Sequence, residues 1–246
     1  MKSLKRSRRI NQILSLSGHS SRRKADELIV SGRVMLNGQI IRELGTKAIW
    51  GHDSIKVDGQ EIRTPSERTY LMLNKPFGYL CSLDDPSGRP LATDLLKTIQ
   101  QRVYSVGRLD FDSLGLLLFT DDGEWAHRLT HPRYHVPKTY KITIEGTISE
   151  MQLNILRKGV HLEDGFSGPS KLSRIQANAG KSVLRMTVTS GRSRLVRRMM
   201  EAVGHRVVHL IRIGFGVLEL GDLKIGHYRH LESGEVEAMR KMVGLH

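Results

Sequence analysis

The sequence holds a single cysteine, Cys81, among 246 residues. One thiol can form neither a disulfide framework nor a zinc site of several cysteines, and it suits a reducing compartment. The longest apolar run of note, residues 114–119, falls far below the roughly 18–20 residues of a membrane span. No continuous apolar stretch follows the basic N-terminus, so no secretory signal is expected, although Arg- and Ser-rich residues 1–25 leave a transit peptide open. We therefore expect a cytoplasmic protein with no membrane attachment.

The motifs of common cofactor and metal sites are also missing. There is no G-x-x-x-x-G-K-[ST] loop, no dinucleotide fingerprint and no H-E-x-x-H. His131 and His135 lie four residues apart, but Pro132 between them argues against a shared helix face; His205 and His209 lack an obvious third ligand. The sequence thus predicts no metal and no cofactor. Aromatic residues make up only 5%, which argues against an extended base-stacking platform.

Positive charge is abundant. Thirty-nine Lys and Arg against 25 Asp and Glu give a formal net charge of +14. Residues 1–33 hold nine basic side chains against two acidic ones, and six arginines between residues 192 and 212 face only Glu201. Either cluster alone could be a solvated helix face. Two such clusters favour a polyanionic partner, and nucleic acid is the first candidate.

The first sixty residues predict a small helix–helix–hairpin unit. Apolar spacing indicates a helix over residues 9–17, and Ser20 or Ser21 can cap a second helix that ends near Gly32. The Asn37-Gly38 pair between alternating apolar residues predicts a hairpin, and residues 54–57 a further strand. We assign residues 1–62 to a first domain.

The polar stretch 63–68 is typical of a linker, and we assign residues 69–246 to a second domain. Its expected strands cover residues 70–73, 114–120, 138–144 and 184–189. Its expected helices cover residues 91–99, 151–156 and 195–203, with a short helix containing Trp125. Because strands and helices mix without a regular alternation, we expect an α+β fold with a mainly antiparallel sheet.

Residues 106–123 stand out, because Arg108, Asp110 and Asp112 precede a buried strand there. From the residues alone, Asp110 could be a loop acid at a strand mouth or half of a structural ion pair. The segment resembles the signature G-R-L-D-x-x-S/T-x-G-L-L-L-L-T-N-D-G of bacterial ribosomal RNA pseudouridine synthases of the RsuA and RluB type.

Three further blocks resemble this family and appear in its order. They are the N-K-P block at residues 73–82, the K-x-Y block at 138–140 and, at 191–199, a block similar to the family's E-G-x-x-R-Q-V-R-R-M motif. Ser190 and Leu195 depart from the usual acid and Gln of the last block. Residues 21–38 resemble the RNA-binding module of ribosomal protein S-four.

The resemblance implies isomerisation of uridine to pseudouridine in ribosomal RNA, with no metal or cofactor. Asp110 would act on the ribose of a flipped-out uridine, either as a nucleophile or by removing a sugar proton. Arg194 would be its charge partner, and Tyr140 would stack on the base and help to remove the proton from carbon five.

The resemblance also implies a set of substrate-binding residues. Arg108 would hold phosphate or fill the gap in the stack, and Leu116 and Val196 would form apolar walls. The remaining expected RNA contacts are Lys75, Arg197, Arg198, Arg22, Arg23, Lys24 and Arg33. The partner would be ribosomal RNA or a pre-ribosomal particle, bound by a monomer. Residues 162–165 and 168–169 favour the large subunit slightly.

Two other functions stay open at this point. An RNA-binding protein of ribosome assembly with an idle pocket would share the same charge. A glycosidase-like hydrolase could use Asp110 and Asp112, although carboxylates two apart on an irregular loop need not converge on one bond.

Overall fold

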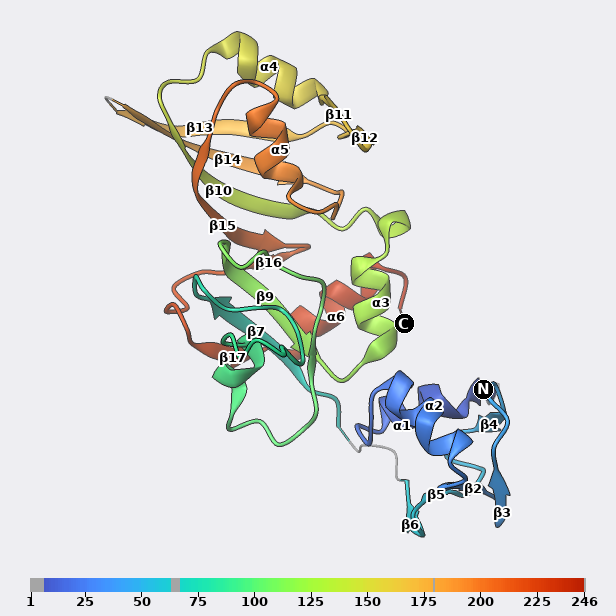
Figure 1. Ribbon diagram of the computed structural model, residues 1–246. Helices are drawn as coiled ribbons and strands as arrows, with labels where there is room; N and C mark the ends of the chain where they lie inside the picture. Colours follow the sequence, from blue (N-terminus) through green and yellow to red (C-terminus); the bar gives the residue numbers. More distant parts are fainter. Residues whose placement is uncertain (1–6, 63–66, 179, 246) are drawn as a thin grey trace. The chain divides into compact units, whose positions relative to one another are not determined.

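The computed structural model describes residues 7–62, 67–178 and 180–245 (Figure 1). Of the expected linker, residues 63–66 lie outside the described residues. Two compact units are present; the first covers the chain up to Thr69 with the short segments Ile99–Val103 and Asp121–Gly123. No helix among the described residues is both long and apolar enough to cross a membrane.

The first unit contains two helices and two small sheets. Helix α1 (Ile10–Leu16) and helix α2 (Arg22–Val30) pack through a shared core with the strands. The Ser21 hydroxyl caps α2 by accepting a hydrogen bond from the Lys24 amide at 3.1 Å, as expected. Strands run in the order β3-β2-β5-β6, with β2 (Val34–Leu36), β3 (Gln39–Ile41), β5 (Ile55–Val57) and β6 (Gln60–Glu61).

The hairpin predicted from Asn37-Gly38 is confirmed. Both residues have positive φ, 50° and 85°, which is the geometry of the two-residue turn that joins β2 to β3. A second sheet, β1 (Ser7–Arg9) paired with β4 (Lys47–Ile49), was not predicted. Its strands are three residues long and nearly forty residues apart, so no local pattern marks them.

The second unit is built on one nine-stranded sheet in the order β13-β14-β10-β15-β9-β7-β17, with β16 beside β15 and β8 beside β9. Its strands are β7 (Tyr70–Lys75), β8 (Tyr104–Ser105), β9 (Leu114–Thr120), β10 (Lys138–Glu145), β13 (Lys171–Asn178), β14 (Lys181–Val188), β15 (Val207–Phe215), β16 (Leu218–Glu219) and β17 (Tyr228–His230). Among the pairs of named strands in the described residues, only β15–β9 is parallel; an isolated bridge between Leu80 and Leu91 is parallel as well. The predicted α+β class with a mainly antiparallel sheet is therefore confirmed.

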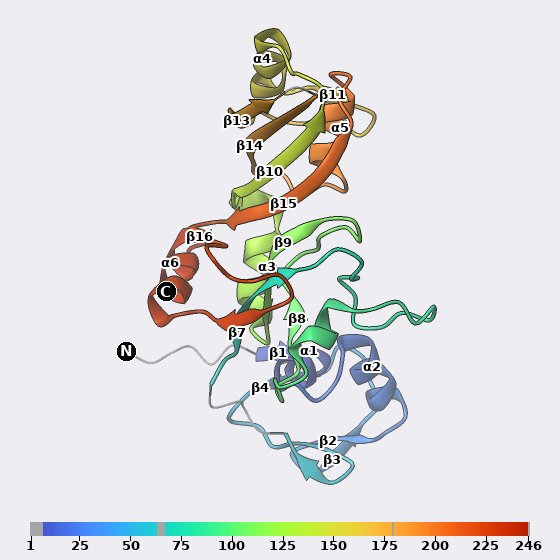
Figure 2. The same cartoon turned by 90° about the vertical axis from the view of Figure 1, so that its left-hand side faces the viewer.

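Helices cover this sheet in two groups (Figure 2). Leu153 of α4 (Glu150–Lys158) and Met199 of α5 (Leu195–Glu201) join the core that β10 and β14 contribute. Trp125 of α3 (Gly123–Thr130) and Met239 of α6 (Ser233–Met242) join the core around β9 and the end of β15. The shorter elements are the 3-10 turns η1 (Ala92–Leu96) and η2 (Pro132–Tyr134) and the hairpin β11 (His161–Leu162)–β12 (Gly165–Phe166).

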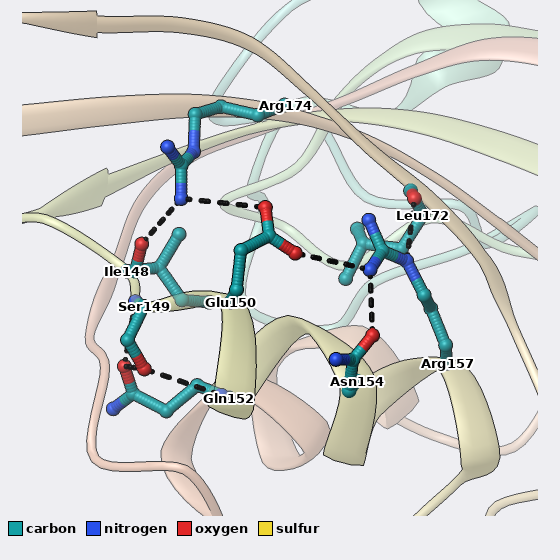
Figure 3. A network of polar contacts seen from close by, with 8 residues as sticks. All are labelled: Ile148, Ser149, Glu150, Gln152, Asn154, Arg157, Leu172 and Arg174. Carbon is teal, nitrogen blue, oxygen red and sulfur yellow. Dashed lines mark hydrogen bonds and ion pairs between the residues drawn. The ribbon is translucent and has the colours of Figure 1, made fainter.

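Hydrogen bonds and ion pairs stabilise both ends of helix α4, as Figure 3 shows. Ser149 and Gln152 form a capping box at its N-terminus. Arg157 near its C-terminus donates to the Leu172 carbonyl of β13 at 3.1 Å and pairs with Glu150 at 3.2 Å. Arg174 of β13 donates to the Ile148 carbonyl at 2.6 Å. These contacts hold the helix against the edge strand.

The expected helix over residues 91–99 is wrong in kind and length, because only the 3-10 turn η1 forms there. Asp94 accepts a hydrogen bond from the Leu91 amide at 2.8 Å, which closes a tight turn, and the helical structure ends at Leu96. Strands β13, β15 and β17 and helix α6 were not predicted.

Candidate active site

A cavity of about 240 Å³ opens in the second unit, slightly smaller than the usual pocket for a drug-sized ligand. The loop before β9, strands β10 and β15, and the loop before α5 provide its walls. The residues that line it include Arg108, Asp110, Lys138, Tyr140, Arg192, Arg194, Val196, Arg212 and Phe215. Among the described residues, no group of three or more His, Cys, Asp or Glu could hold a metal ion.

A buried lysine shapes the loop that carries Asp110. Lys75, at the end of β7, is 0% exposed. Its ammonium donates to the carbonyls of Pro76 at 3.0 Å, Asp110 at 3.2 Å and Ser113 at 2.8 Å. Burial lowers the pKa of this lysine, while the nearby Asp112 and Asp110 carboxylates act in the opposite direction. Lys75 therefore ties β7 to both ends of the Asp110–Ser113 turn.

The arginines before and within α5 reach the same turn through Asp112. Arg197, 6% exposed, pairs with the Asp112 carboxylate at 3.0 Å and donates to the carbonyls of Asp112 and Val207, both at 3.2 Å. Arg194 lies 3.6 Å from the same carboxylate. Arg194 also has φ of 49°, a left-handed conformation that costs a non-glycine residue free energy and is found more often at functional sites.

Tyr140 lies on β10, where its cross-strand neighbour on β15 is Arg212. Two residues earlier, Lys138 faces Phe215. Strand β15 has a bulge between these pairs, because Thr139 pairs with Gly214 and the next residue, Tyr140, pairs with Arg212. All four side chains line the cavity as a result.

The family of RNA pseudouridylate synthases matches residues 69–202, and the S4 domain matches residues 8–48. The chain is also 42% identical over 238 residues to an Aquifex aeolicus protein called an uncharacterized RNA pseudouridine synthase, covering 96% of this chain and 95% of the relative. This chain belongs to the RNA pseudouridine synthase family. It is 40% identical over 236 residues to the ribosomal large subunit pseudouridine synthase B of Bacillus subtilis, covering 95% and 96% of the two chains.

A solved pseudouridylate synthase structure has the same fold. It superposes with a TM-score of 0.67 at 32% sequence identity, and the match covers 94% of this chain and 99% of that one. The predicted relationship to the pseudouridine synthases and to the S-four module is therefore confirmed.

In this pseudouridine synthase, five residues singled out from the sequence line one cavity although they are up to 88 positions apart in the chain. They are Arg108, Asp110, Tyr140, Arg194 and Val196. The expected pairing of Arg194 with Asp110 is not the one formed, because the Arg194 guanidinium contacts Asp112. The Asp110 side chain has no hydrogen bond or ion pair within the described part of the chain.

Four other expected RNA-binding residues have different surroundings from those predicted. Leu116 is fully buried in the core around β9 and does not line the cavity. Lys75 is enclosed by backbone carbonyls, so its ammonium has no access to RNA. Arg197 is buried against Asp112. Arg198 pairs with Asp164 at 2.7 Å.

Asp164 and Arg192 connect the β11–β12 hairpin to the cavity wall. Arg192 donates to the carbonyls of Asp164 at 3.0 Å and Phe166 at 2.7 Å, and it lines the cavity itself. The Arg198 guanidinium holds the pKa of the Asp164 carboxyl below its ordinary value. Arg192 belongs to the second basic cluster of the sequence, but no individual role was predicted for it.

The expected basic residues of the first unit lie on or beside α2. Arg22, Arg23 and Lys24 are exposed, and Lys24 pairs with Glu27 at 2.8 Å. Arg33 forms two hydrogen bonds with Asp58. Arg22 and Arg23 form no ion pair among the described residues, so their guanidinium groups remain available for phosphate.

Lys138, Arg212 and Phe215 are cavity residues that were not predicted from the sequence. Lys138 belongs to the K-x-Y block, which could have drawn attention to it. Arg212 belongs to the second basic cluster of the sequence, but no individual role was predicted for it, and no sequence signal marks Phe215. The β10–β15 register and its bulge bring both residues beside Tyr140 and Lys138.

Proposed function

We propose that this protein isomerises uridine to pseudouridine in ribosomal RNA, with the large subunit as its target. The observation that carries the proposal is the cavity that brings Asp110, Tyr140 and Arg194 together in a chain of this family. Support for the large subunit comes from the 40% identity, across nearly the whole chain, to a relative named for that subunit.

In the proposed mechanism, a uridine leaves its stack and enters the cavity with its ribose beside Asp110. The carboxylate attacks the anomeric carbon or removes a proton from the sugar, and in either case the bond to the base breaks. The base turns and carbon five bonds to the anomeric carbon, as the bond from Asp110 to that carbon breaks or as Asp110 returns the proton to the sugar. The proton on carbon five is then lost. Tyr140 stacks on the base and assists this proton transfer, while Val196 provides an apolar wall.

The carboxylate must be ionised and correctly placed when the uridine enters the cavity. Three groups support its loop: Lys75 binds the carbonyls of Asp110 and Ser113, and Arg194 and Arg197 bind the Asp112 carboxylate. Arg108 is exposed at the cavity and holds RNA phosphate or the space left by the uridine.

RNA capture is assigned to the N-terminal domain, residues 1–62, through Arg22, Arg23, Lys24 and Arg33. Such contacts are to phosphate and give affinity rather than sequence choice. Residues 69–246 form the catalytic domain after the linker 63–68. We propose a cytoplasmic monomer, because ribosomal RNA is its substrate and one chain supplies the catalytic groups.

Mapping of pseudouridine in ribosomal RNA tests this function. RNA from cells with and without the gene is compared, and the deletion strain is complemented with wild-type protein or with Asp110→Asn. We expect at least one large-subunit pseudouridine to disappear in the deletion strain and to return only with the wild type. A modification pattern that is unchanged in the deletion strain, together with tight RNA binding by the protein, would favour an idle RNA-binding protein instead.

A further inference from the structure

Two buried cations lie in the wall of the cavity. Lys138 is 8% exposed and Arg212 is 3% exposed, yet both line the same cavity as Asp110. The Lys138 ammonium is 5.6 Å from the centre of the Phe215 ring, and the Arg212 guanidinium is 5.2 Å from it. One aromatic ring therefore contacts both cations.

Neither cation is neutralised by a carboxylate among the described residues. Lys138 donates one hydrogen bond, to the Thr189 carbonyl at 3.1 Å, which leaves two of its three donors. Arg212 donates from Nε to the Leu116 carbonyl at 2.7 Å, and its Nη2 group is buried with no hydrogen-bond partner in the described part of the chain. Burying charge without a counter-charge is costly, so such a pair indicates a ligand that brings negative charge.

The register between β10 and β15 places Arg212 and Phe215 on the same wall of the cavity. Residues 212 and 215 are three apart and would point to opposite faces of a regular strand. The bulge on β15 removes this difference, so that Arg212 lies beside Tyr140 and Phe215 beside Lys138. The two cations thus share a wall with the tyrosine expected to stack on the base.

We propose that Lys138 and Arg212 bind the uracil ring and stabilise the negative charge that it carries when its bond to the ribose breaks. This inference rests on the proposed function and adds catalytic groups to it. RNA phosphates are the less suitable ligand, because both cations are more than nine-tenths buried, whereas the flipped base enters the cavity itself.

The charge follows from the electron balance of the cleavage step. The bond between the anomeric carbon and N1 breaks, and its electron pair stays with the base. Resonance spreads this pair over N1 and the two carbonyl oxygens. On the sugar side, either an Asp110 oxygen forms the new bond to the anomeric carbon or Asp110 accepts a sugar proton. Donors fixed where charge develops lower the barrier to this step.

The protonation state of Lys138 gives the proposal a second readout. Burial and the neighbouring Arg212 lower the pKa of Lys138 to about 8. The ammonium is therefore charged below that pH and loses its proton above it. The titratable and charged groups that share the cavity are Arg108, Asp110, Tyr140, Arg192, Arg194 and Arg212. The arginines stay charged across this range.

The test measures tritium release from large-subunit RNA labelled at carbon five of uridine, in single-turnover reactions with saturating enzyme. We expect Lys138→Met to lower the rate roughly 100-fold while the RNA dissociation constant changes less than twofold. Lys138→Arg should retain most of the rate. The wild-type rate should fall above pH 8, and this decrease should be absent in Lys138→Arg. Arg212 is left intact, because its bond to Leu116 is buried and its loss could prevent folding.

Lys141→Met is the matched control. Lys141 lies on β10 like Lys138, but it is exposed and does not line the cavity. The Lys141→Met variant should therefore react at the wild-type rate. A Lys138→Met rate within threefold of the wild-type rate would overturn the inference, as would the same alkaline decrease in Lys138→Arg. A wild-type protein that releases no tritium from any ribosomal RNA would instead refute the proposed function, and the inference with it.

Discussion

Lys75 is a buried residue that holds the loop of the proposed catalytic Asp110. Its ammonium binds carbonyls 1, 35 and 38 positions further along the chain. Removing the ammonium would take this donor from all three carbonyls, at about 1–3 kcal/mol for each buried polar group left unpaired, although the Asp110 carbonyl would keep its bond from the Ser113 amide at 3.1 Å. We propose that Lys75 acts by positioning Asp110, because its buried ammonium binds the Asp110 carbonyl and Lys75 does not line the cavity.

Lys75→Met should therefore reduce the single-turnover rate of tritium release more than it weakens RNA binding. We expect a loss of at least roughly tenfold in rate, in line with the sensitivity of catalysis to small misplacements. The exposed Lys97 serves as the control, because Lys97→Met removes the same charge from the surface. Equal rates for Lys75→Met and the wild type would show that the loop keeps its geometry without this lysine.

At the scale of single elements, the sequence predicted structure correctly where the residues that produce an element lie within one short segment. Ser21 caps α2 and Asn37-Gly38 makes the turn of a hairpin, as predicted. Strand β15 was missed although it is the central strand that carries Arg212. Its partners β10 and β9 are distant in sequence, and its pattern is broken by the bulge at residue 213.

Ser149→Ala tests the cap of α4. The Ser149 hydroxyl accepts a hydrogen bond from the Gln152 amide at 3.2 Å, and loss of such a cap costs about 1 kcal/mol. For a chain of this size we expect the melting temperature to fall by roughly 2–4 °C, measured by circular dichroism. Ser173→Ala on the exposed side of β13 should change it less. Equal melting temperatures for Ser149→Ala and the wild type would mean that the cap adds no stability.

At the scale of the whole molecule, the basic residues that give the net charge of +14 lie in several different environments. Arg192, Arg197 and Arg198 are engaged in ion pairs and backbone contacts near the cavity. Lys75, Lys138 and Arg212 are buried. Composition could predict a polyanionic partner, but not which cations are internal, because that depends on pairings across the sheet. The same reason explains why the Arg194 partner was misassigned.

The exposed arginines of α2 should account for part of the salt dependence of RNA binding. Replacing Arg22 and Arg23 with Gln should lower the slope of log K against log salt by about 0.7–0.9 for each phosphate that the protein no longer neutralises. Lys241→Gln, which removes a charge from α6, should leave the slope unchanged. The measurement is a filter-binding titration at several salt concentrations, and an unaltered slope in the double variant would refute phosphate capture by α2.

The central claim is that Asp110 carries the isomerisation. The most direct measurement compares tritium release from carbon-five-labelled large-subunit RNA by the wild type and by Asp110→Asn, with RNA binding recorded for both. The exchange preserves the size of the side chain and removes its charge. We predict release by the wild type, no detectable release by Asp110→Asn, and equal affinity for RNA. Release at the wild-type rate by Asp110→Asn would contradict the account.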